Sequence, residues 1–249
     1  MTLTVGSGPF GKRPSGEFNV DVPRERLMYL EPFPRRMRAI AGGEVVADSR
    51  RGRLLHEHGR LPRYYFPAED VREDLRGGGD DRWPALAGLV HLEWGSVDEW
   101  LEEDQPAIGH IRDPYHRVDV VDTSRHVVVS RDGETLAESR RARVIFETSL
   151  PPRWYVPRED VRVELAPTDL DTICAYKGHA SYWTARPQGG DPLENIAWTY
   201  REPLHDAARV RDMVCFFNEH VDLDVDGERQ ERPRTPWAAP RWWEHVTPP

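Results

Sequence analysis

The chain has 249 residues, of which 38% are hydrophobic and 31% charged, and its formal net charge is −9. Its length fits one large domain or two domains of about 100 residues each. No apolar stretch reaches the roughly 18 residues of a membrane span, the N-terminus lacks the order of a signal peptide, and the acidic balance disfavours binding to a phosphate backbone. We therefore expect a soluble, cytoplasmic protein that binds neither membrane nor nucleic acid.

An internal repeat organises the chain. The segment VADSRRGRLLHEHGRLPRYYFPAEDVREDL, which starts at Val46, aligns without a gap to LAESRRARVIFETSLPPRWYVPREDVRVEL, which starts at Leu136, at an offset of 90 residues. A weaker match sets LVHLEWGSVDEW, from Leu89, against MVCFFNEHVDLD, from Met213, at an offset of 124 residues. This agreement indicates a duplication, and the larger second offset means that the first copy lacks about 34 residues from its middle.

The repeat predicts five regions in chain order. They are an N-terminal arm (1–35), a truncated first repeat domain (36–105), a connector (106–124), a complete second repeat domain (125–228) and a Pro- and Trp-rich tail (229–249). We expect the two repeats to pack as an intramolecular pseudo-dimer. The tail should fold back onto the body, because its tryptophans Trp237, Trp242 and Trp243 would be costly to leave in water.

Short strands dominate the local pattern. The dipeptide Asp132-Gly133 predicts a tight hairpin, and VDLDVDGE (221–228) alternates as a strand does. One helix is predicted, beginning near Pro203 and running through LHDAARVRDMV (204–214). The predicted fold class is mainly β, with two tandem small antiparallel-sheet domains and minor helix.

The block that the first copy lacks holds the most unusual residues of the chain, CAYKGHASYW (174–183) and ENIAWTY (194–200). We predict a hairpin there with its turn at Lys177-Gly178-His179-Ala180. In the following strand, a period of two places four side chains on one face: Glu194, Ile196, Trp198 and Tyr200. These features predict an aromatic-walled pocket with a lysine at its rim.

Each residue that could carry chemistry in this block also has a structural interpretation. Only Lys12 and Lys177 among the 34 basic residues are lysines, and Lys177 could be a fixed cation, a Schiff-base nucleophile or a solvated turn residue. Cys174 could be an acidified nucleophile or a small buried residue, and His179 a base or a surface histidine. Glu147 could be the general base or acceptor opposite Lys177, or a structural residue.

The predicted ligand-binding residues come from the same block and from the repeated segment before it. They are Arg153, Tyr155, Tyr176, His179, Tyr182, Trp183, Glu194 and Trp198. Aromatic side chains in strands are also common in hydrophobic cores, and that alternative stays open for each of them.

Metal and cofactor sites have little support in the sequence. Two cysteines are too few for a disulfide framework or a four-thiolate zinc site, and the glycine motifs of phosphate and dinucleotide binding are missing. His56 and His58 could present two imidazoles on one strand face, but the second copy has Phe146 and Thr148 at these positions. We expect neither a metal nor a cofactor.

The blocks SRRARVIFETSLPPRWYVPREDVRVEL, CAYKGHASYW, ENIAWTY and FFNEHVDLDVDG resemble the signature of the domain of unknown function 427 family. The second copy covers the whole pattern, with Ala175 where the family usually carries proline, and the first copy resembles the tandem form common in actinobacteria. The resemblance implies a compact domain of antiparallel sheets, similar to the β-tent arrangement. A nucleotidyltransferase label is attached to the family, but the paired acidic residues of two-metal nucleotidyl transfer are not evident here.

Three functions remain open from the sequence. The leading hypothesis is that the second domain binds a small anionic or carbonyl-bearing molecule in an aromatic pocket, with Lys177 as charge partner. The second is an enzyme that uses Lys177 or Cys174 as nucleophile in the same pocket. The third is an interaction module whose aromatic cage holds a side chain or terminus of a partner.

Overall fold

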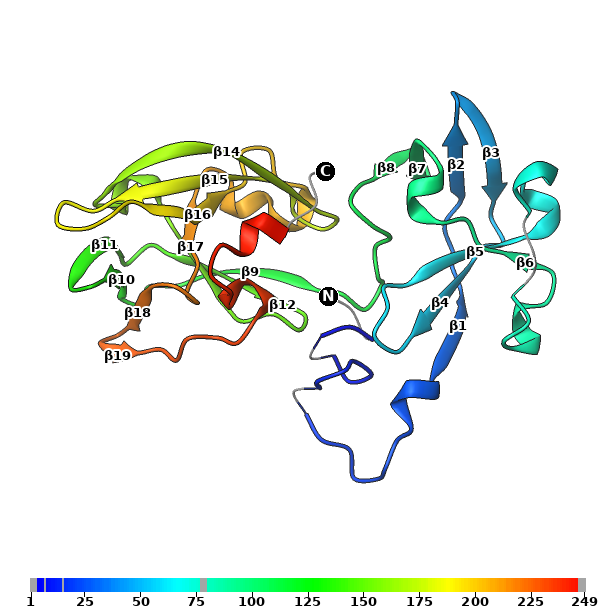
Figure 1. The fold of residues 1–249 in the computed structure, drawn as a ribbon, viewed down its shortest axis with the longest axis horizontal. Helices are drawn as coiled ribbons and strands as arrows, with labels where there is room; N and C mark the ends of the chain where they lie inside the picture. The colour runs from blue at the N-terminus through cyan, green and yellow to red at the C-terminus, as the bar shows by residue number, and fades with distance from the viewer. Residues whose placement is uncertain (1–3, 7, 15, 77–79, 246–249) are drawn as a thin grey trace. The chain divides into compact units, whose positions relative to one another are not determined.

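A computed structural model shows the fold of the chain (Figure 1) and describes residues 4–6, 8–14, 16–76 and 80–245. The chain forms two compact units, unit 1 (Met1–His116) and unit 2 (Arg117–Pro249). Each unit contains two antiparallel sheets, and the described helical residues lie in short 3-10 helices. The mainly β fold class is confirmed. None of the described helices is long and apolar enough to cross a membrane.

Unit 1 contains two four-stranded sheets. One has the order β1-β4-β5-β6 and consists of β1 (Met28–Pro32), β4 (Arg53–Glu57), β5 (Arg63–Pro67) and β6 (Leu89–Val90). The other has the order β3-β2-β7-β8 and consists of β3 (Glu44–Ser49), β2 (Met37–Ala41), β7 (Glu99–Glu102) and β8 (Gln105–Ala107). The 3-10 helices are η1 (Arg24–Arg26), η2 (Ala68–Asp70), η3 (Glu73–Leu75), η4 (Pro84–Leu86) and η5 (Trp94–Ser96).

Unit 2 contains a seven-stranded and a four-stranded sheet. The larger sheet consists, in spatial order, of β14 (Glu164–Cys174), β15 (Gly178–Arg186), β16 (Leu193–Thr199), β17 (Val214–Phe216), β13 (Arg153–Val156), β12 (Arg143–Glu147) and β9 (Val118–Asp122). The smaller sheet consists of β11 (Glu134–Ser139), β10 (Val127–Arg131), β18 (Asp222–Val225) and β19 (Glu228–Arg229). The 3-10 helices are η6 (Arg158–Asp160), η7 (His205–Val210), η8 (Pro236–Ala238) and η9 (Trp242–His245).

Strand pairs in the two units match in register. Arg53 of β4 pairs with Tyr65 of β5, and Arg143 of β12 pairs with Tyr155 of β13, so both partners are 90 residues further along the chain in unit 2. The larger sheet of unit 2 continues from β17 through β16 and β15 to β14, whereas the described sheet of unit 1 ends at β6. The block that sequence comparison finds only in the second copy lies in these three additional strands and their connections.

The weaker alignment departs from the structure by one residue. Trp100 of β7 pairs with Ala39 in unit 1, and Leu223 of β18 pairs with Val129 in unit 2. Because Ala39 and Val129 are 90 residues apart, Trp100 corresponds to Leu223 rather than to Asp224. The ungapped offset of 124 therefore holds at β6 and β17 but not at β7 and β18, which are offset by 123 residues.

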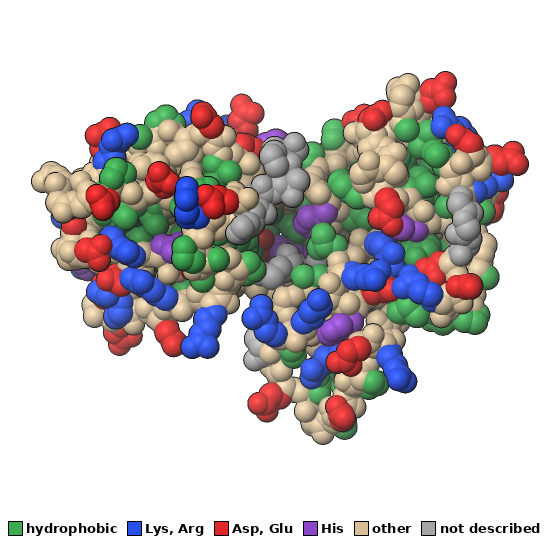
Figure 2. Space-filling model, viewed as in Figure 1, with side chains coloured by type: hydrophobic (Ala, Val, Ile, Leu, Met, Phe, Trp, Pro, Cys, Tyr) green, Lys and Arg blue, Asp and Glu red, His purple; other side chains and the backbone are tan. Residues whose placement is uncertain are grey.

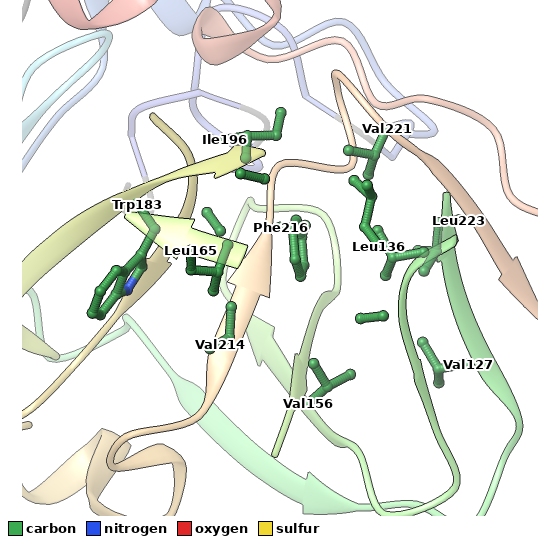
Figure 3. Close-up of a cluster of buried hydrophobic side chains, with 14 of the residues drawn as sticks. Val127, Leu136, Val156, Leu165, Trp183, Ile196, Val214, Phe216, Val221 and Leu223 are labelled. Atoms are coloured by element: carbon green, nitrogen blue, oxygen red, sulfur yellow. The ribbon is translucent and has the colours of Figure 1, made fainter. Parts of the chain in front are cut away.

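Buried side chains of unit 2 form two clusters. The first joins side chains from both sheets, and Figure 3 labels Val127, Leu136, Val156, Leu165, Trp183, Ile196, Val214, Phe216, Val221 and Leu223. Their sequence neighbours Tyr155, Tyr182 and Cys215 belong to the second cluster. Successive side chains of a strand point to opposite faces. The seven-stranded sheet therefore has a core face, toward the smaller sheet, and an aromatic face on its other side.

Three observed elements differ from the expected regions. Residues 118–122 lie in the expected connector but form β9, because the valines at 118 and 120 pack on the aromatic face and the strand pairs with β12. Residues 28–32 lie in the expected arm but form β1, which pairs with β4. The helix expected over 203–214 is reduced to the 3-10 helix η7, since Arg211 bridges to Tyr200 and Asp212 takes a positive φ of 59°.

Candidate functional site

The aromatic face of the seven-stranded sheet carries the candidate site. Its buried cluster includes Tyr155, Tyr182, Trp198, Tyr200, Phe217 and Trp242. The ring centroids of Trp198 and Phe217 are 4.5 Å apart, and the Trp198 indole Nε1 donates a hydrogen bond of 2.8 Å to the Tyr155 hydroxyl. Alternation along β13 and β16 places these rings together, because the residues between them face the core.

The C-terminal tail covers part of this face. Trp242 is buried in the cluster, and Trp237 and Trp243 pack against it. The Thr235 hydroxyl donates a hydrogen bond of 2.6 Å to Glu219 Oε1, and His220 Nε2 lies 2.6 Å from the backbone oxygen of Trp237. The expected return of the tail onto the body through its tryptophans is therefore confirmed.

Lys177 and Glu147 form a buried ion pair at the same face. Lys177 lies in the turn between β14 and β15, Glu147 ends β12, and the Lys177 Nζ donates a hydrogen bond to Glu147 Oε2. The two side chains are 9% and 4% exposed. Burial is the largest single influence and would lower the pKa of Lys177, but Glu147, together with Cys174 and Tyr155, raises that pKa above its usual 10.5. The lysine is therefore a cation at neutral pH.

Two tyrosines and a cysteine lie near this pair. Burial raises the pKa of the Tyr155 and Tyr200 hydroxyls well above 10, so both keep their protons at neutral pH. Cys174, at the end of β14, is partly exposed and contributes electrostatically to the raised pKa of Lys177. The site thus combines one ammonium, one carboxylate and the protonated phenols of two tyrosines from the aromatic cluster.

The ammonium of Lys177 has unused hydrogen-bonding capacity. An ammonium has three N–H donors. Among the residues that the structure describes, the Glu147 carboxylate is the one side-chain acceptor within hydrogen-bond distance of Nζ. Two donors are left without an acceptor among the described residues, and buried donors without acceptors are costly. The arrangement suits an added oxygen atom, from a carbonyl, a carboxylate or another anion.

Arg153 is a second buried cation of this face, and its contacts differ from those of Lys177. Its Nη1 and Nη2 donate hydrogen bonds of 2.7 and 2.6 Å to the two oxygens of Glu219. The rings of Trp198, Phe217 and Trp237 lie 5.5, 5.8 and 5.7 Å from the guanidinium carbon. The Arg153 guanidinium therefore lies among these three aromatic rings, where a cation of a binding partner would otherwise lie.

Three residues predicted for the pocket lie elsewhere. Trp183 belongs to the core face, where Arg158 stacks on its ring at 4.2 Å. Glu194 is exposed and lines a separate cavity of about 310 Å³ beside the tail. His179 is exposed and lies 3.1 Å from the carboxylate of Asp171.

The hairpin forms, but its turn is shifted relative to the prediction. β14 ends at Cys174 and β15 begins at Gly178, so the turn is 175–177 and Lys177 is its last residue. Gly178 has a φ of +94°, and a Cβ there would lie 3.3 Å from backbone atoms of Glu202 and Leu204. Glycine is needed at this position because the chain turns and approaches another backbone segment closely.

The predicted common face of residues 194–200 is interrupted. Asn195 has a positive φ of 49°, and the pairing register shifts between Trp183 and Ala185 on the neighbouring strand. Ile196 consequently packs on the core face, whereas Trp198 and Tyr200 lie on the aromatic face. A bulge of this kind leaves no clear signature in an alternating pattern.

The structure brings the other predicted residues to the aromatic face or its edge. Tyr182 forms a hydrogen bond of 2.7 Å with the Thr172 hydroxyl, and burial raises the Tyr182 pKa to about 12. Tyr176 is buried in the turn that carries Lys177. The sequence does not single out Glu219 or Phe217, although both lie in the repeated segment FFNE (216–219). The first copy has Gly95 and Glu93 at the aligned positions, so the repeat gives no signal for them.

These features define a two-unit, mainly β protein with a buried lysine and glutamate pair in its second unit. Residues 29–82 and 119–227 match the family model described as Domain of unknown function (DUF427), and the chain belongs to this family. The two matched segments fall in unit 1 and unit 2 respectively. A comparison with curated proteins finds no match.

Proposed function

We propose that unit 2 binds a small anionic or carbonyl-bearing molecule at its aromatic face, with Lys177 as the charge partner. The observation that carries the proposal is the buried Lys177 ammonium, which has three donors and a single described side-chain acceptor, Glu147. A ligand oxygen would satisfy a remaining donor, and the protonated hydroxyls of Tyr155 and Tyr200 provide further polar groups nearby. The rings of the cluster would contact the rest of the molecule.

Both alternatives have less support than this proposal, beginning with an enzyme that uses Lys177 as its nucleophile. A Schiff base forms through a neutral amine, whereas Glu147 raises the pKa of Lys177 and keeps it protonated. An aromatic cage for a partner's cation also has less support, because Arg153 already lies among Trp198, Phe217 and Trp237. A polar small-molecule site uses the observed charges as they stand.

We further propose that the two units derive from one duplicated domain, with the complete site retained in the second. The equal registers at an offset of 90 residues and the missing counterparts of β14, β15 and β16 in the described part of unit 1 support this history. Unit 1 keeps Glu57 where unit 2 has Glu147, but the described part of unit 1 contains no equivalent of the turn that carries Lys177.

Mass spectrometry of the purified full-length protein under native and then denaturing conditions tests the proposal. We expect a small bound mass that is released on denaturation and is missing from Lys177→Met/Glu147→Gln, a double variant without a net change in charge. The matched control Arg141→Met/Asp160→Asn removes an ion pair between an exposed arginine and a half-buried aspartate of unit 2 and should retain the bound mass. Retention of the same mass by the Lys177→Met/Glu147→Gln variant would contradict the proposal, and a covalent adduct at Lys177 or Cys174 would favour the enzyme.

A further inference from the structure

Unit 1 contains a cavity with a surplus of positively charged groups. Figure 2 shows both acidic and basic side chains on each unit in this view. One cavity of about 450 Å³ is lined by Arg60, Arg63, Tyr65, Asp80, Arg82 and His91. Three guanidinium groups thus share a space with one lining carboxylate.

The carboxylates near this cavity are already engaged. Arg82 donates to Asp80 at 2.8 and 2.5 Å and to Glu57 Oε1 at 2.5 Å, and Arg63 donates to Glu57 Oε2. The Tyr65 hydroxyl donates to Asp80 at 2.7 Å. Three guanidinium groups therefore lie near two carboxylates that have their hydrogen bonds made, and a third, exposed carboxylate, Glu93, lies 3.3 Å from His91 Nε2.

Donors outnumber acceptors in the same way. Each guanidinium carries five N–H donors, and the contacts to Asp80 and Glu57 use four donors of Arg63 and Arg82. The Nε of Arg63 is buried without a partner, and the exposed Arg60 side chain makes no hydrogen bond or ion pair with residues that the structure describes. Planar guanidinium donors of this kind match the oxygens of phosphate and carboxylate groups.

The position of the cavity relates it to the site in unit 2. Glu57 of β4 corresponds to Glu147 of β12 at the offset of 90 residues. Lys177 pairs with Glu147, whereas Arg82, from the segment in place of the missing strands, pairs with Glu57. In unit 1 the equivalent glutamate therefore also forms an ion pair with a cation, Arg82, but further arginines lie around this pair instead of an aromatic cluster.

We propose that the arginine-lined cavity of unit 1 binds a small oxyanion with two negative charges, such as a phosphate group. Arg60 and Arg63 supply unused donors, and Arg82 forms hydrogen bonds with Glu57 and Asp80. The two charges of such an anion would interact with three guanidinium groups, and its several oxygens match the surplus donors. The site lies in unit 1 and does not depend on the function proposed for Lys177.

Calorimetric titration of the full-length protein at pH 7.5 and constant ionic strength tests the site, with sodium phosphate, sodium sulfate and sodium acetate as separate ligands. We expect phosphate and sulfate to bind and acetate to bind at least about tenfold more weakly, because it has one charge. Arg60→Met should weaken phosphate binding at least about fivefold. Arg50→Met removes an exposed arginine of unit 1 outside the cavity and should change it less than about twofold.

Several outcomes would overturn the proposal. No heat of phosphate binding in the wild-type protein would do so, as would an equal loss in Arg60→Met and Arg50→Met, which would indicate nonspecific attraction. Acetate that binds as well as phosphate would replace the dianion with a simple carboxylate ligand. Binding that survives Arg60→Met but is lost in Lys177→Met/Glu147→Gln would place the anion in unit 2 instead.

Discussion

Replacing Lys177 with methionine should strongly destabilise unit 2, because the buried Glu147 carboxylate then loses its hydrogen bond and ion pair with the Lys177 ammonium. Both side chains are less than a tenth exposed, so water cannot readily replace the lost partner. Removing one partner of a buried ion pair costs about 3–5 kcal/mol, and we expect the free energy of unfolding of unit 2 to fall by that amount. Lys177→Met/Glu147→Gln removes both charges and should recover at least about 2 kcal/mol of this loss.

Native-state hydrogen exchange of the β12 and β15 amides is the appropriate assay, because two units can unfold separately and a single global transition would mix them. Arg141→Met is the control: it removes an exposed guanidinium that lies 2.6 Å from the half-buried Asp160 and should cost about 1 kcal/mol or less. If Lys177→Met costs no more than Arg141→Met, or if the double variant is no more stable than Lys177→Met alone, the buried pairing is wrong.

Three further predictions concern acid stability, thiol reactivity and the turn. Burial opposes ionisation of Glu219, but hydrogen bonds from Arg153 bring its pKa below the usual 4.5. The contribution of Glu219 to stability is therefore present above about pH 4.5 and is lost as the pH falls through the lower folded-state pKa. Acid titration followed by circular dichroism should show a smaller loss of stability in Glu219→Gln than in the wild-type protein, and identical curves would contradict this. Burial raises the pKa of the Cys215 thiol, whereas Cys174 is partly exposed, so iodoacetamide should modify Cys174 first. Peptide mass spectrometry measures the order of modification, and earlier modification of Cys215 would refute the placement of the two thiols. Gly178→Ala should lower the free energy of unfolding by about 1–3 kcal/mol, because alanine is strained at a φ of +94° and its Cβ meets backbone; urea unfolding that shows no change would refute this.

The elements with strong local signals could be predicted from the sequence. Asp132 and Gly133 take positive φ values of 50° and 86° between β10 and β11, as the hairpin signal requires. The alternating segment after residue 220 forms β18 as predicted. The 11-residue β14 has a weak pattern because Pro167 and a register shift interrupt it, and η7 lacks the length of a helix because tertiary contacts of Arg211 end it.

The candidate site could be predicted only in part. Lys177 stands out because lysine is rare in this chain, and Glu147 because it ends a repeated strand, and the structure pairs them. Simple alternation places Glu194 on the pocket face, but the positive φ of Asn195 and the bulge beside it disrupt that alternation. Trp183 directly follows Tyr182 in β15 and therefore lies on the opposite face, toward the core. Long-range partners such as the tail and Glu219 depend on tertiary packing, for which the local sequence has no periodic signal.

The most direct test of the account uses the two lysines of the chain. Protein labelled with ¹⁵N only at the lysine side chains gives two ammonium signals in a nuclear magnetic resonance spectrum, and Lys12→Arg assigns the one from Lys177. The spectrum is recorded for refolded protein before and after addition of the low-molecular-mass filtrate of the expressing cells. The account predicts that the Lys177 signal stays protonated above pH 10.5 and shifts on addition of the filtrate while the Lys12 signal does not. A Lys177 signal that titrates like that of an exposed lysine, or that does not move, would contradict a buried ligand-binding cation.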